Sequence, residues 1–239
     1  MIEKSAAIEE LVYQYIHLPL GGKKVRCPYW MDKIKRGIVG PFGGKGTPEQ
    51  IVEATLAAAK KERINLDSFS ASQIRTFMKK NRIGLDCSGL AFNLLDVLDK
   101  ERGGNGLVDD IPGARGKFLV RANVRMLTER RVAGIIPKVA DLKVGDMIKL
   151  HSRRRIKHIL VVVEIKRDRK SKIEEIIYAH SSPGTKISGV HKGKIVVGDE
   201  NLGLEAQDWQ EKTKKGENYG KANFCPRNGD GIRKLKIWD

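Results

Sequence analysis

The sequence predicts an α+β fold, with helices in the first part of the chain and an antiparallel sheet in the second. Up to about residue 133, apolar residues recur at the three- and four-residue spacing of amphipathic helices. After Gly134 they form short runs separated by turn residues, which is typical of strands. Helices and strands segregated along the chain indicate the α+β class.

Four helical segments are expected besides the central one, and two of them have clear start signals. Residues 6–17 have helical spacing and stop at the Leu-Pro-Leu-Gly-Gly that follows. Thr47 precedes a proline, and Gln50 would complete a capping box. Ser70 is a natural N-cap for a helix ending near Asn81. Residues 117–133 could form a further helix, which would end at Gly134.

The central helix is expected to begin at a cysteine. The run Asp-Cys-Ser-Gly at residues 86–89 leads into leucines at 90, 94, 95 and 98. A helix N-terminus carries partial positive charge and unpaired N–H groups, which favour a thiolate and can hold an oxyanion. Asp86 opposes this effect unless it caps the helix. The alternative is that Cys87 is a small buried core residue, as most free cysteines are.

The strands predicted after Gly134 place two histidines at one sheet edge. Met147–His151 follows a tight turn, and His158–Ile165 is apolar on both faces, as in a central strand. A third strand runs from Ile173 to His180, and two more are expected over 187–197 and 231–238. Antiparallel pairing of the second and third strands would put His158 beside His180. A cysteine nucleophile needs such an imidazole as base and a third group to orient it.

This order of elements resembles the NlpC-type cysteine peptidases, a papain-like family that cleaves peptide bonds in bacterial cell-wall stems. The shared features are Asp-Cys-Ser-Gly before an apolar helix, a Gly-Asp turn into a strand, and two later strands with a histidine each, over about residues 83–197. The resemblance implies Cys87 as nucleophile, His158 as general base and His180 as its orienting residue. His17, His151 and His191 have no counterpart and are interpreted as structural or surface residues.

The resemblance also implies a division into domains and a set of substrate-binding residues. Residues 83–239 would form the catalytic domain with a papain-like core, in which the antiparallel sheet packs on the nucleophile helix, and residues 1–82 a helical extension packed on it. Tyr29 resembles part of the aromatic motif that the family places before the cysteine. Tyr29, Ser88 and Arg155 are the candidate substrate-binding residues.

Composition limits the other possibilities. The chain has 239 residues, three widely spaced cysteines and a net charge of +17. The cysteine spacing predicts reduced thiols and no metal or cofactor. No apolar run is long enough to span a membrane, and the first residues lack a secretory pattern, so a cytoplasmic protein is expected. Positive charge concentrates between residues 151 and 172, where nine basic residues accompany two acidic ones.

Three functions fit these observations. The first is hydrolysis of an amide bond in a peptide or peptidoglycan fragment by Cys87, His158 and His180. The second is acyl transfer by the same residues to an amine or alcohol. The third is binding of nucleic acid or another polyanion on a papain-like shell, but the basic region lacks the interleaved aromatic residues that stack on bases.

Overall fold

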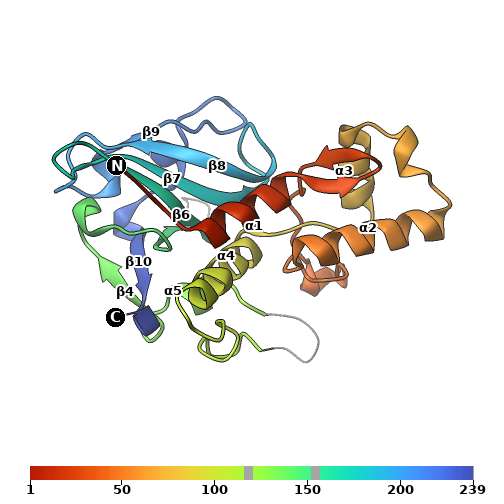
Figure 1. Ribbon diagram of the computed structural model, residues 1–239, viewed down its shortest axis with the longest axis horizontal. Helices are drawn as coiled ribbons and strands as arrows, with labels where there is room; N and C mark the ends of the chain where they lie inside the picture. The colour runs from red at the N-terminus through yellow and green to blue at the C-terminus, as the bar shows by residue number, and fades with distance from the viewer. Residues whose placement is uncertain (116–120, 152–156, 239) are drawn as a thin grey trace.

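A computed structural model describes residues 1–115, 121–151 and 157–238. It confirms the α+β class, with a curled antiparallel sheet and helices that cover it (Figure 1). The strands of the sheet are β1 (Ile2–Lys4), β4 (Ala133–Ile136), β5 (Met147–His151), β6 (Lys157–Arg167), β7 (Ile173–Ser182), β8 (Gly189–Val196), β9 (Asp208–Trp209) and β10 (Gly231–Leu235).

The sheet is built around β6, the most apolar strand. Its order is β4-β10-β5-β6-β7-β8-β9, and β1 pairs with the far end of β6. The register sets Val161 opposite Ala179 and His180 opposite His191. Antiparallel pairing of β6 with β7 is therefore confirmed, and it brings the start of one strand to the end of the other.

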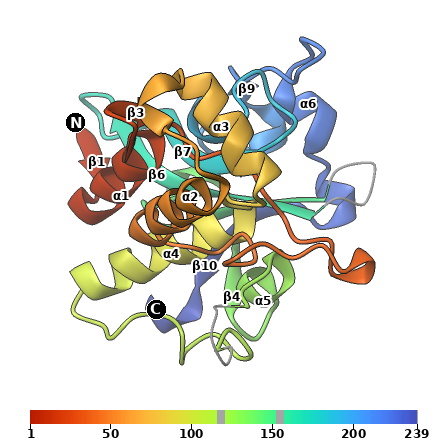
Figure 2. The ribbon, with the colours of Figure 1, turned by 90° about the vertical axis from the view of Figure 1, so that its right-hand side faces the viewer.

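Three helices begin directly after the capping residues Thr47, Ser70 and Asp86, as the sequence predicts. They are α1 (Ala6–Ile16), α2 (Pro48–Glu62), α3 (Ala71–Lys80), α4 (Cys87–Glu101), α5 (Val124–Thr128) and α6 (Tyr219–Asn223), and a small hairpin of β2 (Leu18–Leu20) and β3 (Lys23–Val25) follows α1. The capping box of Thr47 with Gln50 is present, and a second one joins Ser70 to Gln73. Figures 1 and 2 show α2 and α3 grouped together at the end of the molecule opposite β4 and β10.

The helix expected over residues 117–133 is largely wrong. Only Val124–Thr128 is helical among the residues described there, and the chain enters β4 at Ala133. Asn123 starts the helix late, because its side chain accepts the Met126 N–H at 3.1 Å. Gly134 lies inside β4 instead of ending a helix.

Two strand boundaries also differ from the sequence expectation. The strand expected over 187–197 begins at Gly189, which has φ +93° and lies against the carbonyl of Cys27. A side chain at that position would meet the Cys27 oxygen at 2.2 Å. The last strand ends at Leu235, and Lys236–Trp238 forms a 3-10 turn.

The α4 helix lies at the centre of the hydrophobic core. It packs against β6 and β7, while α1 packs beside it on β8, so the two helices cover one face of the sheet. Leu90, Leu94, Leu95 and Leu98 are all at most 3% exposed. Burial of each such side chain contributes about 1.5–3 kcal/mol, so this helix is held rigidly where its first residue faces the sheet.

The first 82 residues share this core with the rest of the chain. They add β1 to the main sheet, and α1 contributes Ile8, Val12 and Tyr15 to the same buried cluster as the sheet strands. The Val190 N–H also donates to the carbonyl of Cys27. The division at residue 82 stays a prediction. Among helices in the described ranges, none has the length and hydropathy needed to cross a bilayer.

Asp146, at the entrance to β5, predicts a pH dependence of stability. It is 2% exposed, and burial raises its pKa to about 7, although the Lys143 N–H donates to its carboxyl group. An unfolded aspartate releases its proton near pH 4. Between about pH 4 and 7 the folded protein binds more protons, so the free energy of unfolding falls as pH rises and is level above that range.

Asp146→Asn should remove this fall in stability with rising pH, because the amide keeps an acceptor for the Lys143 N–H but carries no charge. The variant is expected to be more stable than wild type at pH 8, by up to about 4 kcal/mol, and to lose this advantage near pH 4. Urea unfolding at the two pH values measures the difference. Exposed Asp110→Asn is the matched control. If Asp146→Asn changed the free energy of unfolding by the same amount at both pH values, Asp146 would not be the group that causes the pH dependence.

Candidate active site

Cys87 is the first residue of α4 and lies at the wall of a large cavity. Asp86 caps the helix, because its carboxylate accepts the Gly89 N–H at 2.7 Å. The first turn packs against the backbone of Gly44, whose carbonyl accepts the Asp86 N–H. Cys87 is 8% exposed and lines a cavity of about 1240 Å³ together with Tyr29 and His158. The thiol is therefore buried in the protein but open to a ligand.

The surroundings of Cys87 keep its sulfur protonated at rest. Burial raises its pKa to about 12, and the Asp86 carboxylate adds to the rise. Lys45 and the N–H groups of Ile159 and Ser88 lower the pKa by a smaller amount. Burial and the Asp86 charge thus outweigh the helix N-terminus, and the sulfur needs a base to lose its proton.

Lys45 forms an ion pair with the Asp86 carboxylate. Its ammonium group lies 2.5 Å from the Asp86 carboxylate and 2.8 Å from the Ser88 hydroxyl, and the lysine side chain is only 11% exposed. A buried carboxylate needs such a partner. The ion pair is not expected from the sequence, because Lys45 lies in a glycine-rich loop that is distant from α4 along the chain.

His158 is the second residue of β6 and precedes a residue that contacts the thiol. The Ile159 N–H donates to the Cys87 sulfur, and Ile159 directly follows His158. His158 is half-buried and lines the same cavity. Burial lowers its pKa well below the usual value, and the neighbouring His180 lowers it further. His158 is therefore a neutral imidazole, which can accept a proton.

A chain of hydrogen bonds runs from His158 into the core. His158 Nε2 lies 2.8 Å from His180 Nδ1, and His180 Nε2 lies 3.1 Å from the carboxylate of Glu211. Burial acts to raise the pKa of Glu211, but hydrogen bonds from His180 and His191 outweigh it and leave the pKa lowered. Glu211 is thus an acceptor, which sets both tautomers: His180 donates from Nε2 and His158 donates from Nε2. The free lone pair of His158 is then on Nδ1.

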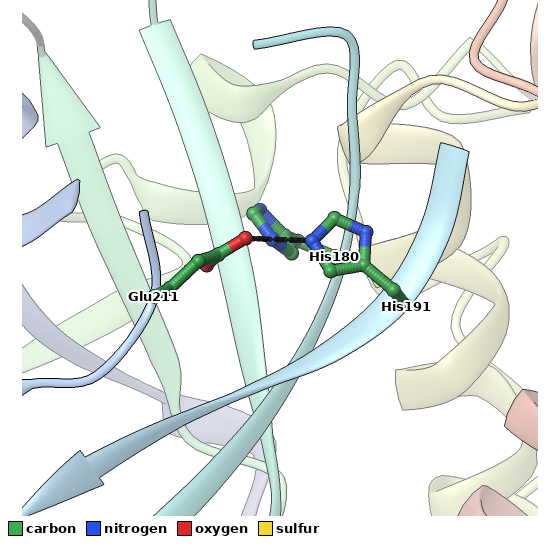
Figure 3. A group of neighbouring side chains, drawn as sticks. All are labelled: His180, His191 and Glu211. Atoms are coloured by element: carbon green, nitrogen blue, oxygen red, sulfur yellow. Dashed lines mark hydrogen bonds and ion pairs between the residues drawn. The ribbon is translucent and has the colours of Figure 1, made fainter. Parts of the chain in front are cut away.

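His191 and Glu211 are the residues that sequence reasoning missed. His191 is not on the surface, since it is 2% exposed and lies 2.6 Å from Glu211 and 2.9 Å from His180, as Figure 3 shows. Its place opposite His180 follows from the pairing of β7 with β8, so the strand register could have indicated it. Glu211 follows the short β9 strand in a polar stretch that carries no pattern.

The three predicted substrate-binding residues differ in how they relate to the cavity. Tyr29 lines the cavity, because its backbone forms a parallel bridge with Leu85, two residues before Cys87. Ser88 also borders the cavity, but it is 5% exposed and its hydroxyl already donates to Asp86 and accepts from Lys45. Arg155 lies outside the described residues.

The rest of the cavity wall is mainly apolar and carries some positive charge. Its apolar residues include Met31, Ile34, Phe42, Val124, Met126 and Leu150. Arg121, Arg125 and Lys157 also line it. Such a wall suits a ligand that combines an apolar group with an anionic one.

Comparison with models of protein families finds no matching family, and comparisons with curated proteins and with solved structures find no similar protein. Function must therefore be argued from the arrangement of Cys87, His158, His180 and Glu211.

Proposed function

We propose that this protein is a cysteine hydrolase that cleaves an amide bond, with a papain-like core of the NlpC type. Cys87 is the nucleophile, His158 is the general base and His180 positions His158. One observation carries the proposal: the thiol and a neutral imidazole face one cavity, and the imidazole is held from behind by the hydrogen-bonded chain through His180 to Glu211.

The mechanism starts from a neutral pair. As the Cys87 sulfur attacks the carbonyl carbon, its proton passes to His158 Nδ1, the ring nitrogen that His180 leaves free. The backbone N–H groups at the first turn of α4 hold the oxyanion. His158 then gives its proton to the leaving amine, and a thioester on Cys87 remains. Water hydrolyses this thioester, with His158 again acting as base.

The cavity wall limits the substrate class. The apolar residues would hold an apolar side chain or acyl group. Arg121, Arg125 and Lys157, which also line the cavity, would attract a carboxylate. A peptide or peptidoglycan fragment with a free carboxylate has both features. The acyl-transfer alternative shares every step up to the thioester and differs only in the final acceptor.

Trapping of the thioester tests the proposal. Incubation with p-nitrophenyl acetate is expected to place one acetyl group on Cys87, detected by intact mass and peptide mapping after acid quench. Cys27 is an internal control, because it is fully buried and burial raises its pKa. Cys225 is a second control, because it is partly exposed and lies outside the cavity.

The Cys87→Ala variant should form no thioester while retaining its circular dichroism spectrum. Acetylation of Cys225 at the same rate as Cys87 would show ordinary thiol reactivity and contradict the proposal. Added amines or alcohols separate hydrolysis from acyl transfer, because only a transferase would convert them to the acetylated product in preference to water.

A further inference from the structure

Three side-chain atoms converge on one point in the core behind the proposed base. His180 Nε2, His191 Nε2 and Glu211 Oε1 are separated by 2.9, 3.1 and 2.6 Å (Figure 3). The two histidines are at most 3% exposed and the Glu211 side chain is 8% exposed. The cluster therefore holds its polar atoms away from bulk water.

When both histidines are neutral, these three atoms present more lone pairs than protons. His191 Nδ1 lies 2.9 Å from the carbonyl of Gly189, which can only accept, so the proton of a neutral His191 is on Nδ1. Its Nε2 then directs a lone pair at the Glu211 carboxylate. A neutral His180 can supply only one proton to the three atoms. The 2.6 Å contact between His191 Nε2 and Glu211 therefore needs a positive charge at this point, and either a second proton on His191 or a bound cation supplies it.

The outer atoms of the same residues are already held by partners. Besides the bond from His191 to Gly189, Glu211 Oε2 accepts the Tyr178 hydroxyl at 2.6 Å, and His180 Nδ1 lies 2.8 Å from His158 Nε2. Metal-binding histidines and carboxylates usually have such outer hydrogen bonds, which aim the inner atoms at the ion. Thr185 adds an oxygen 3.3 Å from His191 Nε2, and its own proton is donated to the Ile187 carbonyl.

We propose that His180, His191 and Glu211 form a binding site for Zn²⁺. Two imidazoles and one carboxylate are a common zinc ligand set. Tetrahedral binding at zinc–ligand distances of about 2.0–2.1 Å places neighbouring ligand atoms roughly 3.3 Å apart. The three atoms therefore have to separate by roughly 0.2 to 0.7 Å to reach this spacing. The nearby Thr185 Oγ1 would supply a fourth oxygen.

Zinc binding would switch off the base, a consequence that rests on the proposed function. With Zn²⁺ on its Nε2, neutral His180 carries its proton on Nδ1 and donates it to His158 Nε2. Neutral His158 must then carry its own proton on Nδ1, the nitrogen that the proposed mechanism uses as the base. Neither ring gains or loses a proton overall, but His158 can no longer accept one from Cys87. The site would make the hydrolase inactive when zinc is bound.

Equilibrium dialysis against micromolar Zn²⁺ tests the site independently of activity. The Cys87→Ala variant is used, since the thiol is itself a zinc ligand. One Zn²⁺ per chain is expected, and Co²⁺ in its place should show the visible absorption of a tetrahedral site. Adding Glu211→Gln or His191→Ala should weaken binding by more than roughly 100-fold, whereas His17→Ala, just after the end of α1, should leave it unchanged.

Absence of stoichiometric zinc in the folded Cys87→Ala variant would overturn the proposal. Zinc affinity that stays at the level of this parent variant after Glu211→Gln or His191→Ala is added would overturn it too. The activity arm uses the intact thiol. Zinc should inhibit acetylation of Cys87, and a chelator should restore it. If Glu211→Gln loses the same fraction of its own activity to zinc, the metal acts on the thiol and the switch is refuted. Stoichiometric binding in a protein without any hydrolase activity would support the site and refute only the proposed function.

Discussion

Replacing His158 with alanine is expected to slow the acylation of Cys87 by about 100- to 10,000-fold, the contribution of a positioned general base. The reason is the resting state of the sulfur. Its pKa is raised to about 12 by burial and Asp86, so almost no thiolate exists at pH 7 without a proton acceptor. Stopped-flow release of p-nitrophenol, at equal protein concentrations, measures the first acylation step.

His151→Ala is the matched control for this variant. His151 is also at the end of a strand, β5, but it lies outside the cavity and contacts the carbonyl of Asn228. This variant is expected to keep the wild-type rate. A His158→Ala protein that is folded and acylates as fast as wild type would show that the sulfur is activated by another group.

Gly89→Ala is expected to destabilise the fold by about 1–3 kcal/mol or more, as overpacking of a tight core does. A Cβ at this position would lie 2.2 Å from the Gly44 carbonyl oxygen and 3.0 Å from the Lys45 Cα. Both obstacles are backbone atoms, which cannot move aside as a flexible side chain can. Alanine favours helix over glycine by up to about 1 kcal/mol, so the steric cost is expected to dominate. Urea unfolding measures the difference.

Gly134→Ala is the control, because a Cβ there meets no atom within 4 Å and its φ is not in the left-handed region. Its stability should equal or slightly exceed that of wild type. Gly89→Ala should also slow thioester formation, because any shift of the first turn of α4 moves Cys87 relative to His158. A Gly89→Ala protein as stable as wild type would show that the Gly44 and Lys45 backbone yields easily.

The positions of His158 and His180 show how much of the structure can be predicted from local sequence pattern. The apolar run after His158 and the strand ending at His180 predict adjacent antiparallel strands, and the structure places His158 Nε2 2.8 Å from His180 Nδ1. The same reasoning applied to residues 117–133 gave too long a helix. It overlooked Asn123 as a cap within this segment, and the start of β4 at Ala133 depends on pairing with the distant β10.

The α+β class, the start of α4 at Cys87 and the strand positions of His158 and His180 could all be predicted from local pattern, since each depends on residues close together in the chain. The positions of Tyr29, Lys45 and Glu211 around these residues became visible in the folded protein, because long-range packing brings them together. The tertiary structure also decided the protonation of Cys87, because the pKa of a thiol depends on its burial and on the charges around it in space.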